Sequence, residues 1–194
     1  MEYGFYAFVS RMKNIGRWAL MRNACPENVQ EHSHMVAVIA HALAVIRRDI
    51  FGKRANPDRA AAAALFHDAS EIFTGDMPTP VKYLNPEIKK AYKDVEALAF
   101  LRLLDTLPEE MRGAYADLID CDAETEELVK AADTLAAHIK CLEELKAGNA
   151  EFALAARQTR EKIEAMNMAE ADYFMERFLP AFELTLDELN YSID

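Results

Sequence analysis

The residues best suited to chemistry are concentrated in the stretch LFHDASEIFTGDMPTP, residues 65–80. His67 and Asp68 are adjacent there, and Glu71 and Asp76 follow. Glu71 is four residues after His67 and three after Asp68, which on a helix places the three side chains on neighbouring parts of one face. Leucine, phenylalanine and isoleucine surround these acids, and carboxylates in apolar surroundings need a cation or a hydrogen-bond network. The stretch therefore favours buried carboxylates that have such partners, with ordinary solvated carboxylates as the alternative.

A second histidine is expected to point into the protein. The segment ENVQEHSHMVAVIAHALAVIRRD has helical spacing, and His32 lies in line with its apolar stripe, which consists of Val29, Val36, Ile39, Leu43 and Ile46. His34 and His41 lie about 200° and 180° around the helix from His32, so they are predicted to be on the surface. An inward histidine at position 32 is either a functional residue or a hydrogen-bonded core residue, and its spacing leaves both open.

An aspartate in a third segment also has apolar surroundings. In TEELVKAADTLAAHIKCLEELKAGN, Asp133 is bracketed by AAD and TLAA, whereas Asp117, Asp120 and Asp122 lie among other acids. The composition around Asp133 favours a partly buried carboxylate. A solvated helix face is the alternative, because helices commonly carry exposed acids.

Length and charge limit the kinds of protein this can be. At 194 residues the chain is expected to be one domain, residues 1–194, large enough to bury a core without disulfides or a structural metal. The 22 basic and 33 acidic residues give a net charge of −11, which argues against nucleic-acid binding. The three cysteines are widely spaced, and no apolar run is long enough to cross a membrane. A cytoplasmic protein with no membrane partner is therefore expected.

The secondary structure is predicted to be all-α, because apolar residues recur at intervals of three and four and strand alternation is absent. Asn28 and Asn56 are predicted helix caps, the second followed by Pro57 at the first helical position. Three prolines make DMPTPVKYLNP a loop. The expected helices cover about residues 3–14, 28–48, 56–75, 87–106, 108–120 and 125–147, with one or two more after residue 150, broken near Pro180.

The pattern H…HD…D, formed by His32, His67, Asp68 and Asp133, resembles the metal-binding signature of the HD-domain phosphohydrolase superfamily. Longer strings, RWALMRN, ENVQEHS, HDASEIFTGDMPTPVKY and VKAADTLAAHIKCLEELKAGN, resemble the bacterial 5′-deoxynucleotidase family over nearly the whole chain. This resemblance implies a single HD-type helical bundle with one divalent metal ion per subunit, held between helices by these four residues. It also implies hydrolysis of deoxyribonucleoside 5′-monophosphates to deoxyribonucleoside and phosphate, selectivity against ribonucleotides, little base preference, and a homodimer.

The resemblance further implies roles for residues around the metal. Two imidazoles and two carboxylates suit Co²⁺, Mn²⁺ or Zn²⁺. Glu71 and Asp76 are both candidates for the general acid or base, and sequence does not choose between them. Arg17 is expected to bind the phosphate, and Trp18 to form a wall against the sugar that leaves a 2′-hydroxyl without a partner. The expected substrate-binding residues are Arg17, Trp18, His32, Asp68, Asp76, Met77, Pro78, Thr79 and Asp133.

Two alternatives remain open from sequence. One is another phosphohydrolase of the same superfamily, either a cyclic-nucleotide phosphodiesterase or a nucleoside triphosphohydrolase, although a triphosphate would demand more cationic side chains than Arg17, Arg22 and Lys82 provide. The other is a non-catalytic helical module that binds a nucleotide or a metal. Two positioned acids argue against the second alternative, since a binding protein has no use for them.

Overall fold

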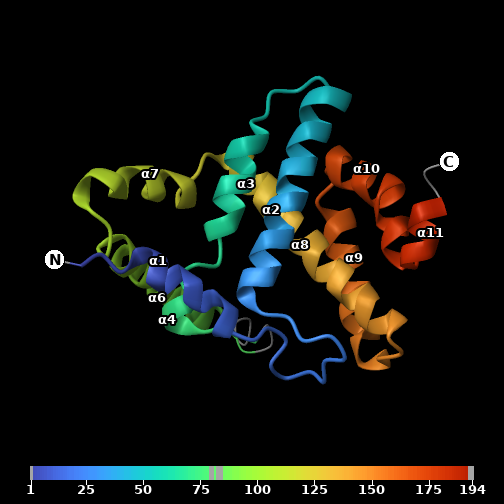
Figure 1. Ribbon diagram of the computed structural model, residues 1–194, viewed down its shortest axis with the longest axis horizontal. Helices are drawn as coiled ribbons and strands as arrows, with labels where there is room; N and C mark the ends of the chain where they lie inside the picture. The colour runs from blue at the N-terminus through green and yellow to red at the C-terminus, as the bar shows by residue number, and fades with distance from the viewer. Residues whose placement is uncertain (1, 79–80, 82–84, 192–194) are drawn as a thin grey trace.

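The computed structural model describes residues 2–78, 81 and 85–191, and this part of the chain consists of helices joined by loops (Figure 1). The predicted all-α fold is confirmed: beyond the helices, the described residues pair only at an isolated antiparallel bridge between Gly16 and Asn28. The α-helices are α1 (Phe5–Val9), α2 (Val29–Val45), α3 (Pro57–Phe66), α4 (Glu71–Thr74), α6 (Pro86–Leu104), α7 (Glu109–Ile119), α8 (Ala123–Lys146), α9 (Ala153–Ala165), α10 (Ala169–Arg177) and α11 (Leu186–Tyr191). Short 3₁₀-helices occur at η1 (Ser10–Asn14), η3 (Ala150–Phe152) and η4 (Leu179–Glu183), and a π-helical turn occurs at η2 (Ile46–Ile50).

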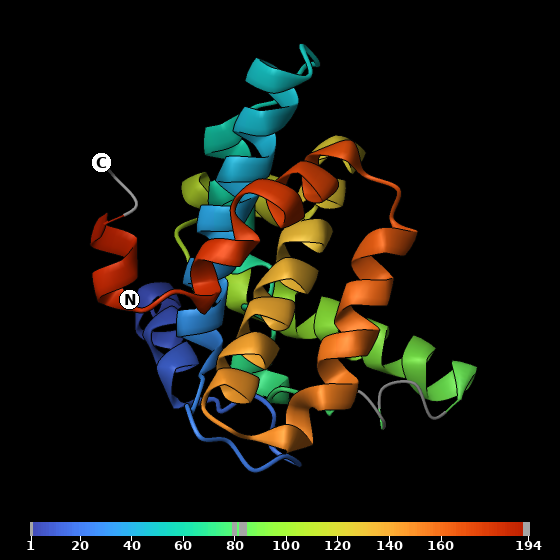
Figure 2. The ribbon, with the colours of Figure 1, turned by 90° about the vertical axis from the view of Figure 1, so that its right-hand side faces the viewer.

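Helices α2, α3 and α8 pack against one another at the centre of the molecule (Figures 1 and 2). The alanine run of α3 buries Ala60, Ala63 and Ala64 almost completely, and such small side chains let the neighbouring backbones approach closely. The apolar stripe predicted for residues 29–46 is buried throughout, as expected. Side chains of α2, α3, α8, α9, α10 and η4 form the main core.

Local capping explains where the central helices begin. The Asn28 side chain accepts a hydrogen bond from the backbone of Glu31, whose own side chain bonds back to the Asn28 backbone, so the predicted capping box is present. Asn56 caps α3 with Pro57 at its first position, also as predicted. Asp122 caps α8 by accepting from the Thr125 backbone.

A second cluster of apolar side chains lies on the other side of the central helices. It joins α1, α4, α6 and α7, seen at the left of Figure 1, with the turn that follows α3. Its buried members are Phe5, Ala69, Leu103, Leu104 and Leu107. This cluster fixes the turn containing His67 and Asp68 from outside the main core.

The prediction of one helix from residue 56 to about 75 is wrong, because α3 ends at Phe66 and α4 starts only at Glu71. The His67 ring Nδ1 donates to the carbonyl of Ala64 at 2.7 Å, and the His67 backbone N–H also points to that carbonyl at 3.4 Å. In a continuous helix this oxygen would accept from Asp68, so the histidine side chain competes with the regular ladder. The turn after Phe66 is closed by tight i→i+3 backbone hydrogen bonds. Among them, the Ala69 N–H donates to the Phe66 carbonyl, and the Glu71 N–H donates to the Asp68 carbonyl.

Two other predicted boundaries also differ. The first helix, expected over about residues 3–14, is α-helical only over Phe5–Val9 and continues as the tighter turn η1. The C-terminal region breaks at Leu179–Glu183 next to Pro180 as expected, but it also breaks between α9 and α10. Asn167 adopts a left-handed backbone there, with φ of 49°, which asparagine tolerates better than most residues.

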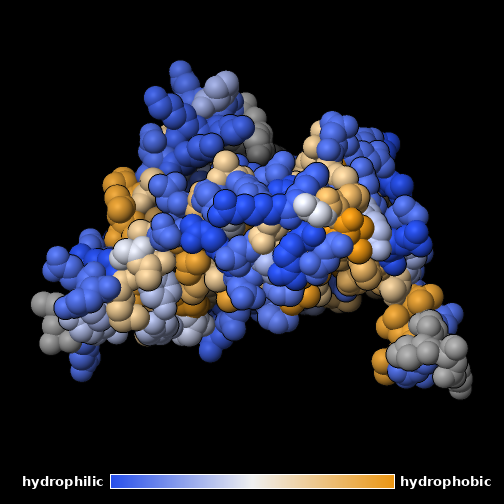
Figure 3. Space-filling view, turned by 90° about the horizontal axis from the view of Figure 1, so that it is seen from above, coloured by the Kyte–Doolittle hydropathy of each residue, from blue (hydrophilic) through white to orange (hydrophobic). Residues whose placement is uncertain are grey.

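No helix in the described part of the chain is long and apolar enough to cross a bilayer. Figure 3 shows a largely hydrophilic face with scattered hydrophobic residues, the pattern of an ordinary solvated surface.

Candidate active site

Three separate segments bring the predicted metal ligands together. His32 comes from the first turns of α2, His67 and Asp68 from the turn after α3, and Asp133 from the middle of α8. One ligand atom from each of His32, His67 and Asp68 lies within 4.8 Å of the others. Asp133 joins this cluster through His32, whose Nε2 lies 3.0 Å from Asp133 Oδ1 and 3.8 Å from Asp68 Oδ2.

The hydrogen bond of His67 determines which ring nitrogen faces the cluster. A carbonyl only accepts, so the Nδ1 that contacts Ala64 carries a proton and Nε2 is the nitrogen that can offer a lone pair. Nε2 is buried, and its 3.1 Å contact with Asp68 Oδ2 lacks the alignment of a hydrogen bond. A histidine oriented by a backbone carbonyl, with its other nitrogen free, is the usual arrangement of a metal ligand.

His32 and Asp133 differ in their exposure. His32 is fully buried, as its position on the apolar stripe predicted, whereas 38% of the Asp133 side chain is exposed. The cluster therefore lies at the edge of the core with one carboxylate reaching toward solvent. His34 and His41 are both exposed, in agreement with the sequence prediction, and His34 is not part of the cluster.

The charges around Asp68 stabilise its ionised form. Burial alone would raise the pKa of Asp68, but His67, Arg17 and His32 together hold it well below its usual range. Burial alone would likewise lower the pKa of His67, but without a cation its neighbours Asp68 and Asp133 raise it to about 9, so a cation would have to displace a proton from Nε2 to bind there. The Arg17 Nη1 group is 3.3 Å from Asp68 Oδ2, so it reaches the edge of the cluster.

The pKa values of Glu71 and Asp76 are raised, in contrast to that of Asp68. Glu71 is 7% exposed, and one of its carboxylate oxygens is buried without a hydrogen-bond partner among the described residues. Burial, with the negative charges of Asp68 and Asp76 nearby, raises the pKa of Glu71 to about 9. Burial also raises the pKa of Asp76, partly offset by Arg17. Glu71 therefore carries a proton at neutral pH.

The loop before α2 supplies Arg17 and Trp18. Residues 15–17 run antiparallel to residues 27–29, with backbone hydrogen bonds on both sides of the bridge, and this pairing fixes the two side chains beside the cluster. Both donate to Glu27 Oε2, Arg17 Nε at 3.1 Å and Trp18 Nε1 at 3.0 Å. The sequence reasoning did not identify Glu27, because a single glutamate in an acidic chain carries no distinguishing spacing.

The family resemblance predicts that the segment after α4 contacts substrate. Met77 and Pro78 are half-buried, non-helical residues directly after Asp76. Within the described residues, no hydrogen bond or ion pair joins either of them to the cluster. Thr79 lies outside the described residues.

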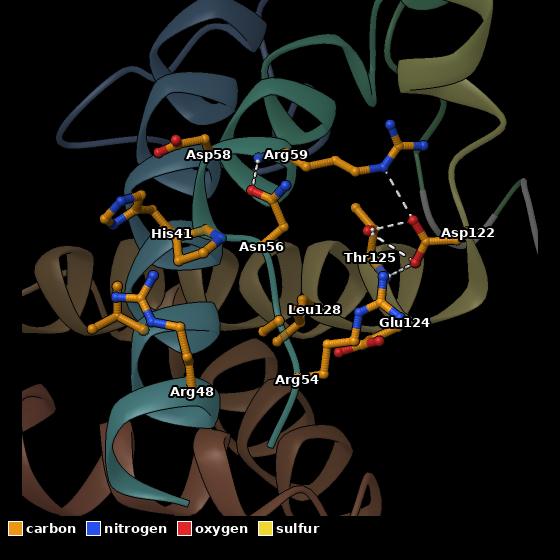
Figure 4. A pocket seen from close by; sticks show the side chains of 13 residues that line it. His41, Arg48, Arg54, Asn56, Asp58, Arg59, Asp122, Glu124, Thr125 and Leu128 are labelled. Atoms are coloured by element: carbon orange, nitrogen blue, oxygen red, sulfur yellow. Dashed lines mark hydrogen bonds and ion pairs between the residues drawn. The ribbon is translucent and has the colours of Figure 1, made fainter. Parts of the chain in front are cut away.

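A cavity of about 940 Å³ lies at the other end of α2, around His41 (Figure 4). Its charged residues are three arginines and three acids, so it has no net positive charge that would favour a phosphate group. Figure 4 shows Arg59 directed toward Asp122, at 3.1 Å, and Asn56 and Asp122 already cap the helix ends that border the cavity. The charged lining residues are Arg48, Arg54, Asp58, Arg59, Asp122 and Glu124.

Solved structures share this fold. An HD-domain phosphohydrolase from Listeria innocua matches with a TM-score of 0.79 and 25% identity, covering 97% of this chain and 96% of that one. An HD phosphohydrolase of cyanophage S-2L, solved with dA and one catalytic Zn²⁺ ion, matches with a TM-score of 0.67 and 23% identity, covering 93% and 99%. An all-α fold that gathers histidine and aspartate side chains from three segments defines the class of HD-domain phosphohydrolases.

Sequence similarity identifies the family within this class. A family model described as 5′-deoxynucleotidase YfbR-like matches residues 4–182. The 5′-deoxynucleotidases YfbR of Shigella boydii and Escherichia coli are each 52% identical to this chain over 189 residues, covering 96% of it and 95% of the relative. The chain belongs to the YfbR-like 5′-deoxynucleotidase family, which confirms the resemblance drawn from its motifs.

Proposed function

We propose that the protein is a metal-dependent 5′-nucleotidase that hydrolyses deoxyribonucleoside 5′-monophosphates to deoxyribonucleoside and phosphate. The observation that carries this proposal is the cluster of His32, His67 and Asp68 with a partly buried arginine and a buried glutamate beside it. The family membership and the 52% identity to proteins named 5′-deoxynucleotidase support it.

Four side chains of this chain would hold the cation: His32, His67, Asp68 and Asp133. The lone pair of His67 Nε2, left free by the Nδ1 bond, fits that role. A mixed set of nitrogen and oxygen donors suits Co²⁺, Mn²⁺ or Zn²⁺, and the phage relative was solved with Zn²⁺. When bound, such an ion supplies charge neutralisation and a water of lowered pKa.

Arg17 binds the phosphate in this proposal. Its Nε is used by Glu27 and its Nη1 by Asp68, so the guanidinium is held in one orientation before substrate arrives. A fixed guanidinium fork can donate two parallel hydrogen bonds to phosphate oxygens. Because the Arg17 guanidinium is already oriented, little conformational entropy is lost when the phosphate binds.

Glu71 is the better candidate for proton donor. Departure of the nucleoside 5′-oxygen requires a proton, and a carboxyl group with a pKa of about 9 holds one at neutral pH. Asp76, whose pKa is also raised by burial, lies next along the chain and stays the alternative. Both interact electrostatically with Arg17, so both lie near the guanidinium that would bind the phosphate.

Trp18 restricts the sugar. A flat apolar ring beside the sugar leaves a 2′-hydroxyl without a hydrogen-bond partner, which costs about 1–3 kcal/mol and favours deoxyribose. No residue of the proposed substrate set is dedicated to reading a base, so we expect tolerance among bases. Asp76, Met77, Pro78 and Thr79 would contact the substrate without selecting among bases.

The test uses purified, chelator-treated protein reloaded with Co²⁺, Mn²⁺ or Zn²⁺. Phosphate release from deoxyribonucleoside monophosphates, faster than from the matching ribonucleotides and abolished by chelation, is the expected result. Release of pyrophosphate or triphosphate from nucleoside triphosphates, or hydrolysis of cyclic nucleotides alone, would assign another reaction of the superfamily. No release from any of these substrates would favour a binding module.

The assembly and location of the protein are part of the proposal. We expect a homodimer in solution, tested by light scattering coupled to size-exclusion chromatography. We also expect a cytoplasmic protein with no nucleic-acid partner, the latter in keeping with the net charge of −11.

A further inference from the structure

Glu27 connects the two loop residues that the proposed reaction uses. A single oxygen, Oε2, accepts from Arg17 Nε at 3.1 Å and from Trp18 Nε1 at 3.0 Å. The other oxygen lies 3.9 Å from Nδ1 of His32. The Arg17 and Glu27 side chains are 12% and 15% exposed, so these contacts are largely shielded from water. Charge-assisted bonds in such surroundings are stronger than neutral ones.

The Trp18 backbone shows that the surroundings impose its position. Its φ is 58°, in the left-handed region that a bulky side chain rarely adopts. Such a conformation costs about 1–3 kcal/mol and persists only where neighbouring contacts enforce it. Here the indole packs against Phe152, with ring centroids 5.2 Å apart, and its N–H is bound by Glu27. The ring is therefore held at two points.

The backbone pairing places Glu27 where it can do this. The Arg17 N–H donates to the Glu27 carbonyl at 3.0 Å, across from the bridge between Gly16 and Asn28. Arg17 in turn reaches Asp68 Oδ2 through Nη1. One carboxylate thus ties the orientation of the aromatic ring to the orientation of the arginine beside the cluster.

We propose that Glu27 is a positioning residue that sets sugar selectivity by holding the Trp18 indole and the Arg17 guanidinium in one fixed arrangement. This inference rests on the proposed function. Without the Glu27 carboxylate, the indole loses one of its two anchors and can move away from the sugar. A 2′-hydroxyl then meets water in place of an apolar wall, and the ribonucleotide is rejected less strongly.

The experiment compares wild type with Glu27→Gln, using dAMP and AMP as substrates. The ratio of kcat/KM for dAMP to that for AMP is expected to fall about five- to ten-fold, the difference between a charge-assisted and a neutral hydrogen bond. Trp18 is the only tryptophan, so acrylamide quenching of its fluorescence in metal-free protein reports its freedom directly. Quenching is expected to increase in Glu27→Gln. Glu151→Gln, the same change at an exposed glutamate beside Phe152, is the control and should match wild type in both measurements.

A double-mutant cycle separates a bond to the indole from a general loosening of the loop. Trp18→Phe keeps a ring against Phe152 but removes the N–H, so Glu27→Gln should lower the sugar ratio in wild type and not in the Trp18→Phe background. If Glu27→Gln lowers the sugar ratio by the same factor in wild type and in the Trp18→Phe background, the proposal is overturned. Unchanged quenching in Glu27→Gln, or an equal loss of rate on both substrates, would overturn it as well.

Folding is checked by circular dichroism. If Glu27→Gln unfolds, Glu27→Asp, which keeps the charge but shortens the side chain, replaces it in the same measurements. Absence of phosphate release in wild type would reject the proposed function and the claim on selectivity together. The quenching comparison would then still decide whether Glu27 holds the indole.

Discussion

At the scale of single residues, two carboxyl groups three positions apart have pKa values shifted in opposite directions. The pKa of Asp68 is held low by His67 and Arg17, although burial opposes this. The pKa of Glu71 is raised to about 9 by burial and by the charge of Asp68 itself. The ionised group of such a pair suits cation binding, and the protonated group suits proton donation.

Replacing Glu71 with Gln tests this division of roles. The amide has nearly the same shape but no acidic proton to transfer, so kcat should fall by about 10²–10⁴-fold with a smaller change in KM. Steady-state kinetics at neutral pH checks it, with metal content confirmed to match wild type. Asp76→Asn is the comparison, and a larger loss of kcat in that variant would make Asp76 the donor.

Metal binding is tested at Asp68. Asp68→Asn removes a charge from the cluster, so stoichiometric cation should no longer be retained after dialysis. The rise in melting temperature that a cation gives to wild type should also be lost, because only a ligand that binds the folded state stabilises it. His34→Asn, two positions from His32 but exposed, is the control. Equal loss of metal in His34→Asn would place His34 among the ligands.

Much of the site could be predicted from sequence at this scale, and the reasons are physical. His32 falls on a periodic apolar stripe, which fixes its direction, and the same periodicity places His34 and His41 outside. The involvement of Glu27 could not be predicted in this way. Its contacts depend on a non-helical loop and a left-handed tryptophan, for which side-chain periodicity gives no direction.

At the scale of elements, helix starts were more predictable than helix ends. Asn28 and Asn56 cap through bonds to residues three positions later, so the signal is local and visible in sequence. The end of α3 depends on His67, whose ring nitrogen takes the carbonyl of Ala64. A histidine side chain that ends a helix in this way leaves no sequence pattern distinct from an ordinary helical histidine.

Another element-level feature is the attachment of the loop before α2 to α8. Glu144, fully buried, accepts from the backbone N–H groups of Ala24 and Cys25 at 2.8 and 2.9 Å and from Asn149 at 2.7 Å. Lys140 bonds both to Glu144 and to the Cys25 carbonyl. Since this loop also contains Arg17 and Trp18, the buried pair anchors the functional segment to the longest helix.

Glu144→Ala should therefore destabilise the protein by about 3–5 kcal/mol, because it leaves the Lys140 ammonium buried without its partner. Glu164→Ala removes a pair of the same i,i+4 spacing with Arg160 on the surface, and about 0–1 kcal/mol is expected. Urea unfolding at neutral pH measures both. Similar losses for the two variants would show that the buried pair has no special role.

The same pair predicts a pH dependence. Burial opposes ionisation of Glu144, but Lys140 and the backbone N–H groups lower its pKa to about 2. A group with a lowered folded-state pKa stabilises the protein above its unfolded pKa of about 4.3, and this contribution disappears as the pH falls toward 2. The difference in unfolding free energy between wild type and Glu144→Ala should shrink across that interval. A difference that stays constant would assign the stabilisation to packing.

At the scale of the whole molecule, the three apolar clusters share the central helices and the segments attached to them. The main core joins α2, α3 and α8 to α9 and α10, the second adjoins the turn after α3, and the third contains Trp18 and Phe152. We propose that residues 1–194 form one domain, in which these clusters unfold together. Their dependence on shared helices favours a single cooperative transition.

Spectroscopy can follow the clusters separately. Fluorescence of Trp18, the only tryptophan, reports the third cluster. Near-ultraviolet circular dichroism of Trp18→Phe isolates the tyrosines, among them Tyr115, which packs in the second cluster. Far-ultraviolet circular dichroism reports all helices. In metal-free protein the urea midpoints from wild-type fluorescence and wild-type far-ultraviolet signals should coincide, as should the two signals of Trp18→Phe. An earlier loss of most of the tyrosine signal, with the part due to Tyr173 in the main core kept until the main transition, would show that α1, α6 and α7 unfold independently. The turn containing His67 and Asp68 would then lose its outer support before the main core does.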